Sequence, residues 1–484
     1  MPVPTTQVTS LLRVGVVVVL AVVAAACDSD SGARHEDPGT SRPATAGSDV
    51  SARWAHTMSG PSTEDEFDGV AASPDGSTYV TGKFERTVAL GGVSLESAGA
   101  ADIPFARFDA QGQSVWAKRF GGPGEDNLFD VDANADGAVA TGAFSGTVAF
   151  GSTTLTSSGP WDCVIVALAP DGETRWARAF GGPGRDGCNE VTIDRSGTVT
   201  TSIDTQGEWT PVDGPPLPRT RQSDTVLMRL TADGAPTWMQ VVAGAGAQRG
   251  KSLAVAPDGS VSFGGDTVGP LTVAGRTVEA PASGGLRDAW LSRWTPDGTL
   301  QWVDAWGGPG DDLAKGVVDD GDNVSYVGPF TGTMTVGGTT LDAGEGADTL
   351  VAQRSAAGTV RWATSVSASA ALDGSETVAA SDGGILFGSQ SVPGIQFGSA
   401  HGPAIPLDEA DGGTAWLAHY GPDGAPRFAR TIAGTANGRV GEIARAGSRV
   451  YVDVTLRGRA NTINGTPITA AAKDASVWAL DLGG

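Results

Sequence analysis

The chain has 484 residues, of which 71 are glycine and 18% are charged, and its formal net charge is −23. Because the chain is strongly acidic, nucleic acid is a poor partner. The negative charge favours solubility and cationic partners. The sequence has only four histidines and three cysteines. It contains neither a His-Glu-x-x-His nor a Gly-x-Ser-x-Gly motif, and no clustered cysteines and histidines for zinc, so the common hydrolase signatures are absent.

Residues 1–26 are typical of an export signal. An apolar run from Val14 to Val23 follows Arg13 and is too short to span a bilayer, for which about 20 apolar residues are needed. Small residues precede Cys27, as in a bacterial lipobox, which predicts cleavage before Cys27 and its acylation; ordinary secretion is the alternative. We therefore expect an exported protein that a lipid anchor holds on a bacterial membrane, at the cell surface or the periplasmic side.

Residues 27–51 are polar and small, so they are predicted to form a flexible tether. Residues 52–484 contain a single repeat, in which one tryptophan returns about every sixty residues among Gly-rich turns and short β-branched runs. It stands at Trp54, Trp116, Trp176, Trp238, Trp302 and Trp362, with Phe428 in the seventh unit. A period of this kind indicates stacked units that bury their faces against one another, as in a propeller.

The second unit shows the expected plan of a blade. Its four predicted strands are short apolar runs, and an insert at 147–159 separates the second strand from the third. The strands are expected at residues 116–120, 128–133, 138–144 and 163–169, counting the strand that ends the preceding unit. Asp-Gly pairs between them supply the positive φ of tight hairpin turns.

The ends of the repeat predict how the ring closes. The repeat begins on its fourth strand at Trp54 and stops at Leu480 after three strands, so residues 54–59 are expected to pair beside residues 476–481. Such pairing removes the two exposed sheet edges of an open array. The predicted fold is an all-β, seven-bladed β-propeller of four-stranded antiparallel blades, closed by the N-terminal strand in the last blade.

The stretch from Phe120 to Trp176 contains, in order, FGG-x-G-x-D, G-x-V-x-x-G-x-F, FG-x-x-x-L, G-x-x-D and a closing tryptophan. This series resembles the bacterial SBBP-type β-propeller repeats, and the resemblance covers roughly residues 54–484. It is strongest in the second and fifth units and weaker in the third, sixth and seventh, where FGG is absent or altered. The resemblance implies a propeller fold and a cell-envelope location, and it implies no common catalytic activity.

Two cysteines, Cys163 and Cys188, lie outside the lipid site. Cys163 opens the third strand of the second unit, and Cys188 lies in the loop that enters the next unit. Alternate connections of an up-and-down blade share one face, so the two cysteines should emerge on the same side of adjacent blades. Because exported proteins are oxidised, we predict a disulfide between them; two separate buried thiols are the alternative.

Aspartates recur at two register positions of the repeat, before the first and before the third strand. They are Asp65, Asp126, Asp186, Asp312 and Asp373 at the first position, and Asp102, Asp162, Asp224, Asp288, Asp348 and Asp474 at the second. One active site does not need so many copies. We predict that these carboxylates accept hydrogen bonds from loop amides; an acidic rim that attracts cations is the alternative.

One stretch is a candidate metal site. Asp132, Asn134 and Asp136 alternate as the oxygen ligands of a calcium loop do, although the later acidic ligand is missing where Ala140 stands. The alternative is an ordinary hairpin turn. No other cofactor is predicted.

Residues that break the register mark candidate partner-binding loops. Trp161 and Trp209 lie in predicted loops, Arg219 and Arg221 lie in a Pro-rich insert of the third unit, and His401 lies in the longer insert of the sixth. Pro-rich loops with arginines on an acidic body make a docking patch. Drifted surface loops, with tryptophans that cover local clusters, are the alternative.

The sequence therefore predicts a monomeric binding or scaffold module of the cell envelope that has no catalytic residues. Its loops would meet an envelope protein or a polysaccharide, and only its lipid anchor would touch the membrane. Two alternatives stay open: a lyase or hydrolase that acts on polysaccharide through loop carboxylates, and a purely structural envelope component.

Overall fold

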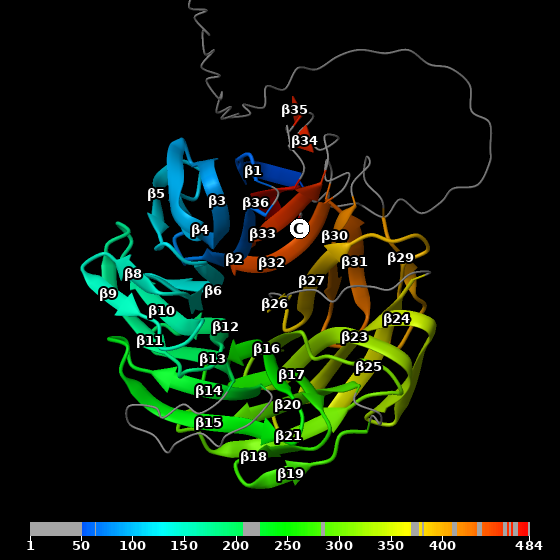
Figure 1. The fold of residues 1–484 in the computed structure, drawn as a ribbon. Coiled ribbons are helices and arrows are strands. Elements are labelled where there is room, and N and C mark those ends of the chain that lie inside the picture. The colour runs from blue at the N-terminus through cyan, green and yellow to red at the C-terminus, as the bar shows by residue number, and fades with distance from the viewer. Residues whose placement is uncertain are drawn as a thin grey trace, which may run out of the picture. The chain divides into compact units, whose positions relative to one another are not determined.

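The computed structural model describes residues 51–62, 64–206, 223–281, 286–368, 377–379, 382–408, 414–432, 438–457, 462–463, 466–467 and 473–482. All elements of regular secondary structure assigned in these ranges are β-strands, and neighbouring strands in a sheet run antiparallel. The sheets stand around a common centre, so the fold is an all-β propeller (Figure 1). The described strands form seven sheets of four or six strands and two separate hairpins.

The first three sheets follow one another along the chain. The first contains β2 (Glu66–Ala72), β3 (Thr78–Leu90), β4 (Val93–Phe108) and β5 (Ser114–Phe120). The second contains β6 (Asn127–Asn134), β7 (Gly137–Phe144), β10 (Asp162–Leu168) and β11 (Thr174–Phe180). The third contains β12 (Asp186–Ile193), β13 (Val199–Thr205), β14 (Asp224–Leu230) and β15 (Pro236–Gly244), extended by β18 (Leu271–Val273) and β19 (Arg276–Val278).

The next three sheets repeat this plan. The fourth contains β16 (Gln248–Val255), β17 (Val261–Val268), β20 (Arg287–Trp294) and β21 (Leu300–Trp306). The fifth contains β22 (Gly316–Asp319), β23 (Asn323–Val336), β24 (Thr339–Ser355) and β25 (Val360–Ser367), extended by β28 (Gln396–Phe397) and β29 (Ile405–Pro406). The sixth contains β26 (Thr377–Ala379), β27 (Ile385–Gln390), β30 (Ala415–Tyr420) and β31 (Pro426–Thr431).

The closing sheet joins the two ends of the described chain. It contains β32 (Gly438–Ala446), β33 (Arg449–Arg457), β36 (Lys473–Asp481) and β1 (Ser51–Met58), and two separate hairpins are β8 (Thr147–Phe150) with β9 (Thr153–Thr156) and β34 (Thr462–Ile463) with β35 (Thr466–Pro467). β1 pairs with β36, with Trp54 opposite Ala479, which confirms the predicted pairing. The strand begins three residues earlier than expected, and Ser59 bridges to Ala89 of the first sheet instead.

Each inner strand is buried on both faces because a sheet packs against a neighbour on either side. In β10, Val164 and Val166 pack into one apolar cluster with Phe105 of the first sheet. The residues between them on β10, such as Ile165, pack into a second cluster with Ile203 of the third sheet. This explains why the third strand of the unit is a continuous apolar run without alternating polar residues.

The register tryptophans connect neighbouring sheets at the turns. The Nε1 of Trp116 donates to Pro170 O at 3.0 Å, and a Cβ on Gly172 of the same turn would lie 2.9 Å from the Trp116 ring. The same bond or ring contact recurs around the ring with Trp54 at Gly112, Trp176 at Gly234, Trp238 at Gly298, Trp302 at Gly358 and Trp362 at Gly424. The turn glycines therefore serve packing between sheets as well as turn geometry.

Two glycines with nearly the same backbone angle allow this contact to be tested. Gly172 has φ +82° and meets Trp116, whereas Gly92 has φ +81° and no heavy atom within 4 Å. Gly92→Ala should cost only the backbone strain of about 1–2 kcal/mol, while Gly172→Ala should cost roughly 1–3 kcal/mol more because the methyl group displaces the ring. Urea unfolding of both variants measures the difference, and equal losses would contradict the packing role.

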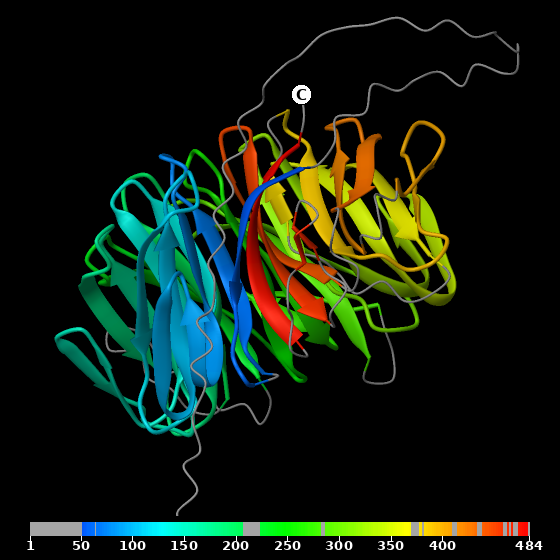
Figure 2. The same ribbon diagram turned by 90° about the horizontal axis from the view of Figure 1, so that it is seen from above.

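The strands cross between two faces of the ring (Figure 2). We call the turn face the side with the tight turns between first and second and between third and fourth strands. The insert face carries the connections from second to third strand and from sheet to sheet. Hairpin inserts start at the insert face and fold back along the outer edge, where β18 pairs with β15 and β28 pairs with β25. Buried side chains such as Leu271 and Phe397 anchor them there and cover strand edges.

Candidate ligand pocket and loop sites

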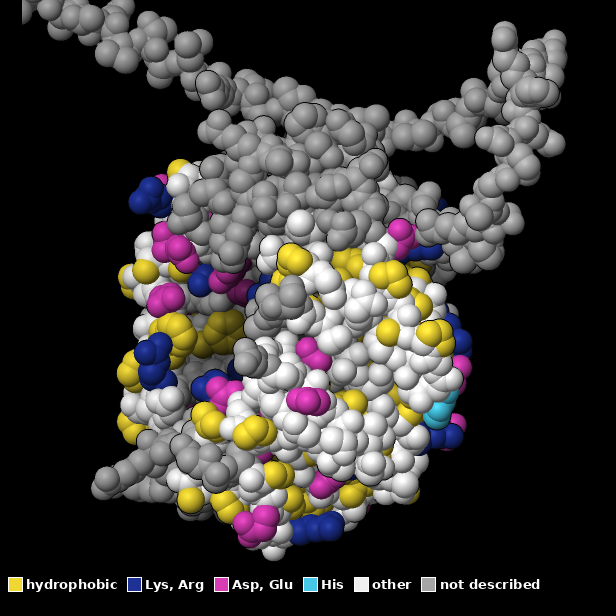
Figure 3. Space-filling view, turned by 90° about the vertical axis from the view of Figure 1, so that its right-hand side faces the viewer, with side chains coloured by type: hydrophobic (Ala, Val, Ile, Leu, Met, Phe, Trp, Pro, Cys, Tyr) yellow, Lys and Arg dark blue, Asp and Glu magenta, His cyan; other side chains and the backbone are white. Residues whose placement is uncertain are grey.

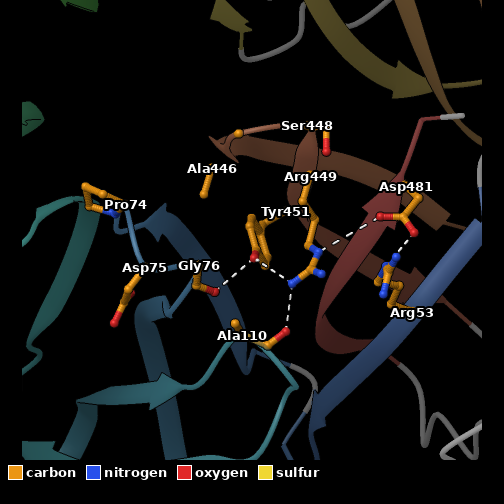
Figure 4. Close-up of a pocket in the computed structure, with 11 residues that line it drawn as sticks. Arg53, Pro74, Asp75, Gly76, Ala110, Ala446, Ser448, Arg449, Tyr451 and Asp481 are labelled. Carbon is orange, nitrogen blue, oxygen red and sulfur yellow. Dashed lines mark hydrogen bonds and ion pairs between the residues drawn. The ribbon is translucent and has the colours of Figure 1, made fainter. Parts of the chain in front are cut away.

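A cavity of roughly 360 Å³ lies on the turn face where the closing sheet meets the first sheet (Figure 4). We call it the seam pocket. Arg53 of β1 and Asp481 of β36 form one wall, and Arg449 and Tyr451 of β33 lie beside them. The turns at 74–76, 110 and 446–448 complete the lining. Its walls thus come from both ends of the described chain, which only ring closure brings together.

The charged groups of the seam pocket form one connected set. Arg53 Nε donates to Asp481 Oδ2, and Arg449 Nε lies 4.0 Å from Asp481 Oδ1. Arg449 Nη1 donates to Ala110 O at 2.7 Å, and the Tyr451 hydroxyl donates to Gly76 O at 2.9 Å. One carboxylate is therefore shared by two guanidinium groups.

The second carboxylate of the pocket, Asp75, is already satisfied. It accepts hydrogen bonds from Ser73 Oγ at 2.6 Å and from Ser77 N at 2.8 Å, and Arg107 lies 3.3 Å away. Partial burial raises the pKa of Asp75, but these hydrogen bonds and Arg107 outweigh it and hold the pKa below its usual value. Asp75 is thus a charged and paired carboxylate at neutral pH.

The seam differs from the other sheet junctions at its tryptophan. The Trp54 Nε1 is buried without a hydrogen-bond partner in the described structure, whereas Trp116 Nε1 donates to Pro170 O. At the seam, Ala110 O corresponds to Pro170 O, and it accepts a hydrogen bond from Arg449 Nη1 in place of the tryptophan. His56 stacks on Phe108 with ring centroids 4.1 Å apart, and its Nε2 lies 2.6 Å from Gly112 O. Burial lowers the pKa of His56, with the Gly112 contact opposing it, so the ring is neutral at pH 7.

The cysteines and Trp161 lie together at the insert face. Cys163 and Cys188 form a disulfide with Cα atoms 5.0 Å apart, which confirms the predicted pairing, although Cys188 lies within β12 and not in a loop. Trp161 is half-buried, and the guanidinium group of exposed Arg185 stacks over its ring, 4.3 Å from the ring centroid. Asp186 N donates to Trp161 O at 2.9 Å. The Trp161 loop is therefore tied to the next sheet by covalent, aromatic and backbone contacts.

The other predicted partner-binding residues are placed differently. Trp209, Arg219 and Arg221 lie outside the described residues, as does the lipidation residue Cys27. His401 is exposed, and its neighbour Ala400 donates its N–H to Gly424 O at 3.1 Å, in a turn of the turn face. The insert of the sixth unit folds along the outer edge, so the structure does not bring His401 next to Trp161.

The register aspartates hold the connections as predicted. Asp126 accepts from Gly122 N at 2.8 Å and from Ser145 N at 3.0 Å. The same two-amide arrangement occurs at Asp186, with Gly182 and Gln206, and at Asp312, with Gly308 and Thr331. Each carboxylate thus joins the loop that enters a sheet to the connection after its second strand. Asp373 and the side chain of Asp474 lie outside the described part of the chain.

The candidate calcium residues form a hairpin turn and its contacts. Asn134 Oδ1 accepts from Asp136 N at 2.8 Å, and Asp132 Oδ2 accepts from Ile193 N of the third sheet at 2.8 Å. The Asn134 amide also donates to Asp194 O at 3.0 Å. Within the described ranges, no three His, Cys, Asp or Glu side chains are grouped to hold a metal ion.

Several buried carboxylates have raised pKa values. Asp130 of β6 accepts from Val191 N at 2.6 Å and from Val131 N at 2.6 Å. Burial raises the pKa of Asp130 to about 7, and the charge of Asp132 adds to this effect, while the amide hydrogen bonds oppose it. Burial also raises the pKa of Asp132 and of Asp312 to about 6. Sequence patterns missed this, because no local motif reports burial between sheets.

These carboxylates predict stability that falls as the pH rises. Between about pH 4 and pH 7 the native state binds the Asp130 proton more tightly than the unfolded chain, so the free energy of unfolding decreases with pH there. From pH 5.5 to pH 8 the Asp130 contribution should be a loss of roughly 2 kcal/mol. His56 acts in the opposite sense, because its lowered pKa makes acidification below about pH 6.5 destabilising.

Urea titrations at pH 5.5 and pH 8 measure this dependence. Asp130→Asn should flatten it, because the amide does not titrate, and His56→Gln should make it steeper. An Asp130→Asn variant with the same pH dependence as the parent would show that the Asp130 carboxyl is not the responsible group.

Acidic and basic side chains are interspersed over the side of the ring in Figure 3. In the described ranges no helix is both long and apolar enough to cross a membrane. The largest exposed apolar side chains there are Val93, Val115 and Leu286, which lie on separate segments.

No family model matches the chain. The regulatory protein FlaEY of Caulobacter vibrioides is 25% identical over 281 residues, a match that covers 51% of this chain and 28% of FlaEY. The chain thus matches little more than a quarter of that relative's length.

Several solved structures have a similar backbone fold. One is a chain of the mitotic checkpoint complex, with TM-score 0.46, 10% identity and 93% of this chain and 98% of that chain covered. Another is the WD40 propeller domain of Doa1, with TM-score 0.44, 8% identity and 89% and 97% covered. A third is the polysaccharide lyase Uly1, with TM-score 0.45, 9% identity and 88% and 91% covered. Similarity at this level does not extend to activity or partners.

Proposed function

We propose that the protein is a binding module of the cell envelope, built from SBBP-type repeats and anchored through an acylated Cys27. In this proposal each of the seven larger sheets is one blade, and β1 completes the last of them. The continuous pattern of paired sheets and the β1–β36 register support the closed ring. A closed ring presents fixed loops on a rigid frame, which suits recognition of a partner.

The observation that carries the proposal is the rigid loop at Trp161. The disulfide joins β10, which follows Trp161, to β12 of the next sheet, and the stacked Trp161–Arg185 pair remains accessible at the insert face. Gln206, the last described residue before the segment that contains Trp209, Arg219 and Arg221, donates its N–H to Arg185 O at 3.1 Å. Aromatic and arginine side chains on a pre-organised loop are typical of binding hot spots.

The hydrogen bonds of the register aspartates favour binding over catalysis. Asp126 and Asp186 each accept two backbone amides and are buried, so they hold loops in place and are not exposed to a substrate. In the proposal the partner is an envelope protein or polysaccharide met by the insert face.

Affinity capture from cell envelopes tests this role. Residues 48–484, which contain every described strand, would be compared with Trp161→Ala, with a deletion of residues 209–221 and with the control Arg276→Ala on the outer hairpin β18–β19. We expect a partner that is retained by the parent and the control and lost from the other two variants. Treatment of the envelopes with protease or glycosidases distinguishes protein from polysaccharide. Capture that is unchanged in all variants would refute the insert face as the binding surface.

A Cys27→Ser variant tests the anchor separately. It should move the full chain from the membrane fraction to the soluble fraction, because the acylated thiol is removed. If the variant stays with the membrane, the anchor is not at Cys27, and the capture experiment still stands.

A further inference from the structure

We propose that the seam pocket binds an acidic sugar, with Arg53 and Arg449 holding its carboxylate and the turns around Tyr451 holding its hydroxyl groups. The site lies on the turn face, so it is separate from the insert-face partner site and goes beyond the binding role proposed above. The argument rests on charge, on available hydrogen-bond donors and on size.

The pocket has a local excess of positive charge in an acidic protein. Arg53 and Arg449 share the single carboxylate of Asp481, and Asp75, the other carboxylate of the lining, has its own partner in Arg107. The chain as a whole carries a net charge of −23. A cluster with one unmatched guanidinium in such a protein attracts an anion, and the planar guanidinium group recognises carboxylates through paired N–H donors.

Donors for that anion are available at the pocket wall. Arg53 is 54% exposed in its side chain and uses only Nε for Asp481, so its two terminal nitrogens have no protein partner in the described structure. The Arg449 side chain is 23% exposed and uses Nη1 for Ala110 O, so its Nη2 has no hydrogen-bond partner there either.

The size and the remaining polar groups of the pocket favour a sugar over a bare anion. The cavity of roughly 360 Å³ equals the share of about a dozen water molecules in the liquid, which leaves room for one hexuronic acid together with bound water. Tyr451 is fully buried and its hydroxyl donates to Gly76 O, so the neutral groups that the wall offers to a ligand are the Ser448 hydroxyl and turn backbone. These neutral groups match sugar hydroxyls. An amino acid fits less well, because both carboxylates of the lining already have cationic partners and none is left for an ammonium group.

Isothermal titration calorimetry on the full chain tests the proposal. The probes are galacturonate and glucuronate oligosaccharides. Galactose and glucose oligosaccharides test whether binding requires the carboxylate, and acetate, inorganic phosphate and glycine test whether it requires the sugar ring. We expect binding of a uronate and at least tenfold weaker binding of its neutral counterpart. Arg53→Gln should weaken uronate binding at least tenfold, whereas Arg276→Gln, which removes an exposed arginine elsewhere, should leave it unchanged.

Several results would overturn the assignment. These are equal binding of uronate and neutral sugar, binding of phosphate or glycine as tight as that of uronate, absence of uronate binding, or equal losses in the two arginine variants. Because Arg53 is exposed, Arg53→Gln should fold normally, which its thermal unfolding midpoint verifies. Capture at the insert face does not involve these residues, so failure of one proposal is distinguishable from failure of the other.

Discussion

Deletion of residues 51–58 should lower the free energy of unfolding by at least about 5 kcal/mol, a loss as large as the whole stability of many domains. The strand makes seven residue pairs with β36, and Met58 is fully buried in the cluster between the closing and first sheets. Truncation of one buried methionine alone costs about 2–5 kcal/mol. Loss of β1 would in addition expose β36 as a free edge that pairs readily with other chains.

Thermal unfolding and size-exclusion chromatography would measure this effect. The matched control is a deletion of residues 1–47, which lie outside the compact unit Ser48–Gly484 and should not change the unfolding midpoint. If both deletions unfold at the same temperature and remain monomeric, β1 does not close the ring.

Removal of the Cys163–Cys188 disulfide should be the second largest effect. The bond joins residues 25 apart in sequence, and a loop of this length restricts the unfolded chain by roughly 3–4 kcal/mol. Both sulfur atoms lie in a buried apolar cluster, so alanine at both positions keeps the surroundings apolar. Urea unfolding of Cys163→Ala/Cys188→Ala should show this loss.

Reductant supplies the control for the disulfide. It should destabilise the parent by a similar amount and have no effect on the double variant. Alkylation of both cysteines in the unreduced, denatured protein would show that the bond is not formed in solution.

Much of the fold could be predicted because the repeat is local. The spacing of Trp54, Trp116 and the later tryptophans, together with the Asp-Gly turns, located the strands of the second unit and the pairing of the two chain ends. Connections between successive strands alternate between the two faces of the ring, which predicted Cys163 and Cys188 on the same face. A disulfide joins them. These features depend on strand period and turn chemistry, which the sequence carries directly.

The course of the inserts could not be predicted because it depends on contacts between units. Nothing near His401 signals that β28 pairs with β25 or that Ala400 reaches the turn of Gly424. The decisive interactions are the burial of side chains such as Phe397 against an outer strand from a different unit. Only the folded ring brings these surfaces together.

The seam pocket escaped sequence analysis for a similar reason. Arg53 precedes its register tryptophan just as Arg175 and Arg361 precede theirs, so its local pattern is not special. Its partner Asp481 lies 428 residues away, at the end of the last strand. At this junction the sheet is completed by two chain ends, whereas a continuous turn joins the third and fourth strands of the other sheets.

The position of β1 also determines how the ring would respond to mechanical load. The chain before Ser51 continues into β1, the strand that completes the closing sheet. A force applied to that part of the chain would act early on the Arg53–Asp481 ion pair. A pull along the strand loads all seven residue pairs together, whereas a pull across it breaks them one after another, starting from Ser51. If Cys27 anchors the chain as proposed, tension on the ring would therefore reach the β1–β36 pairing first.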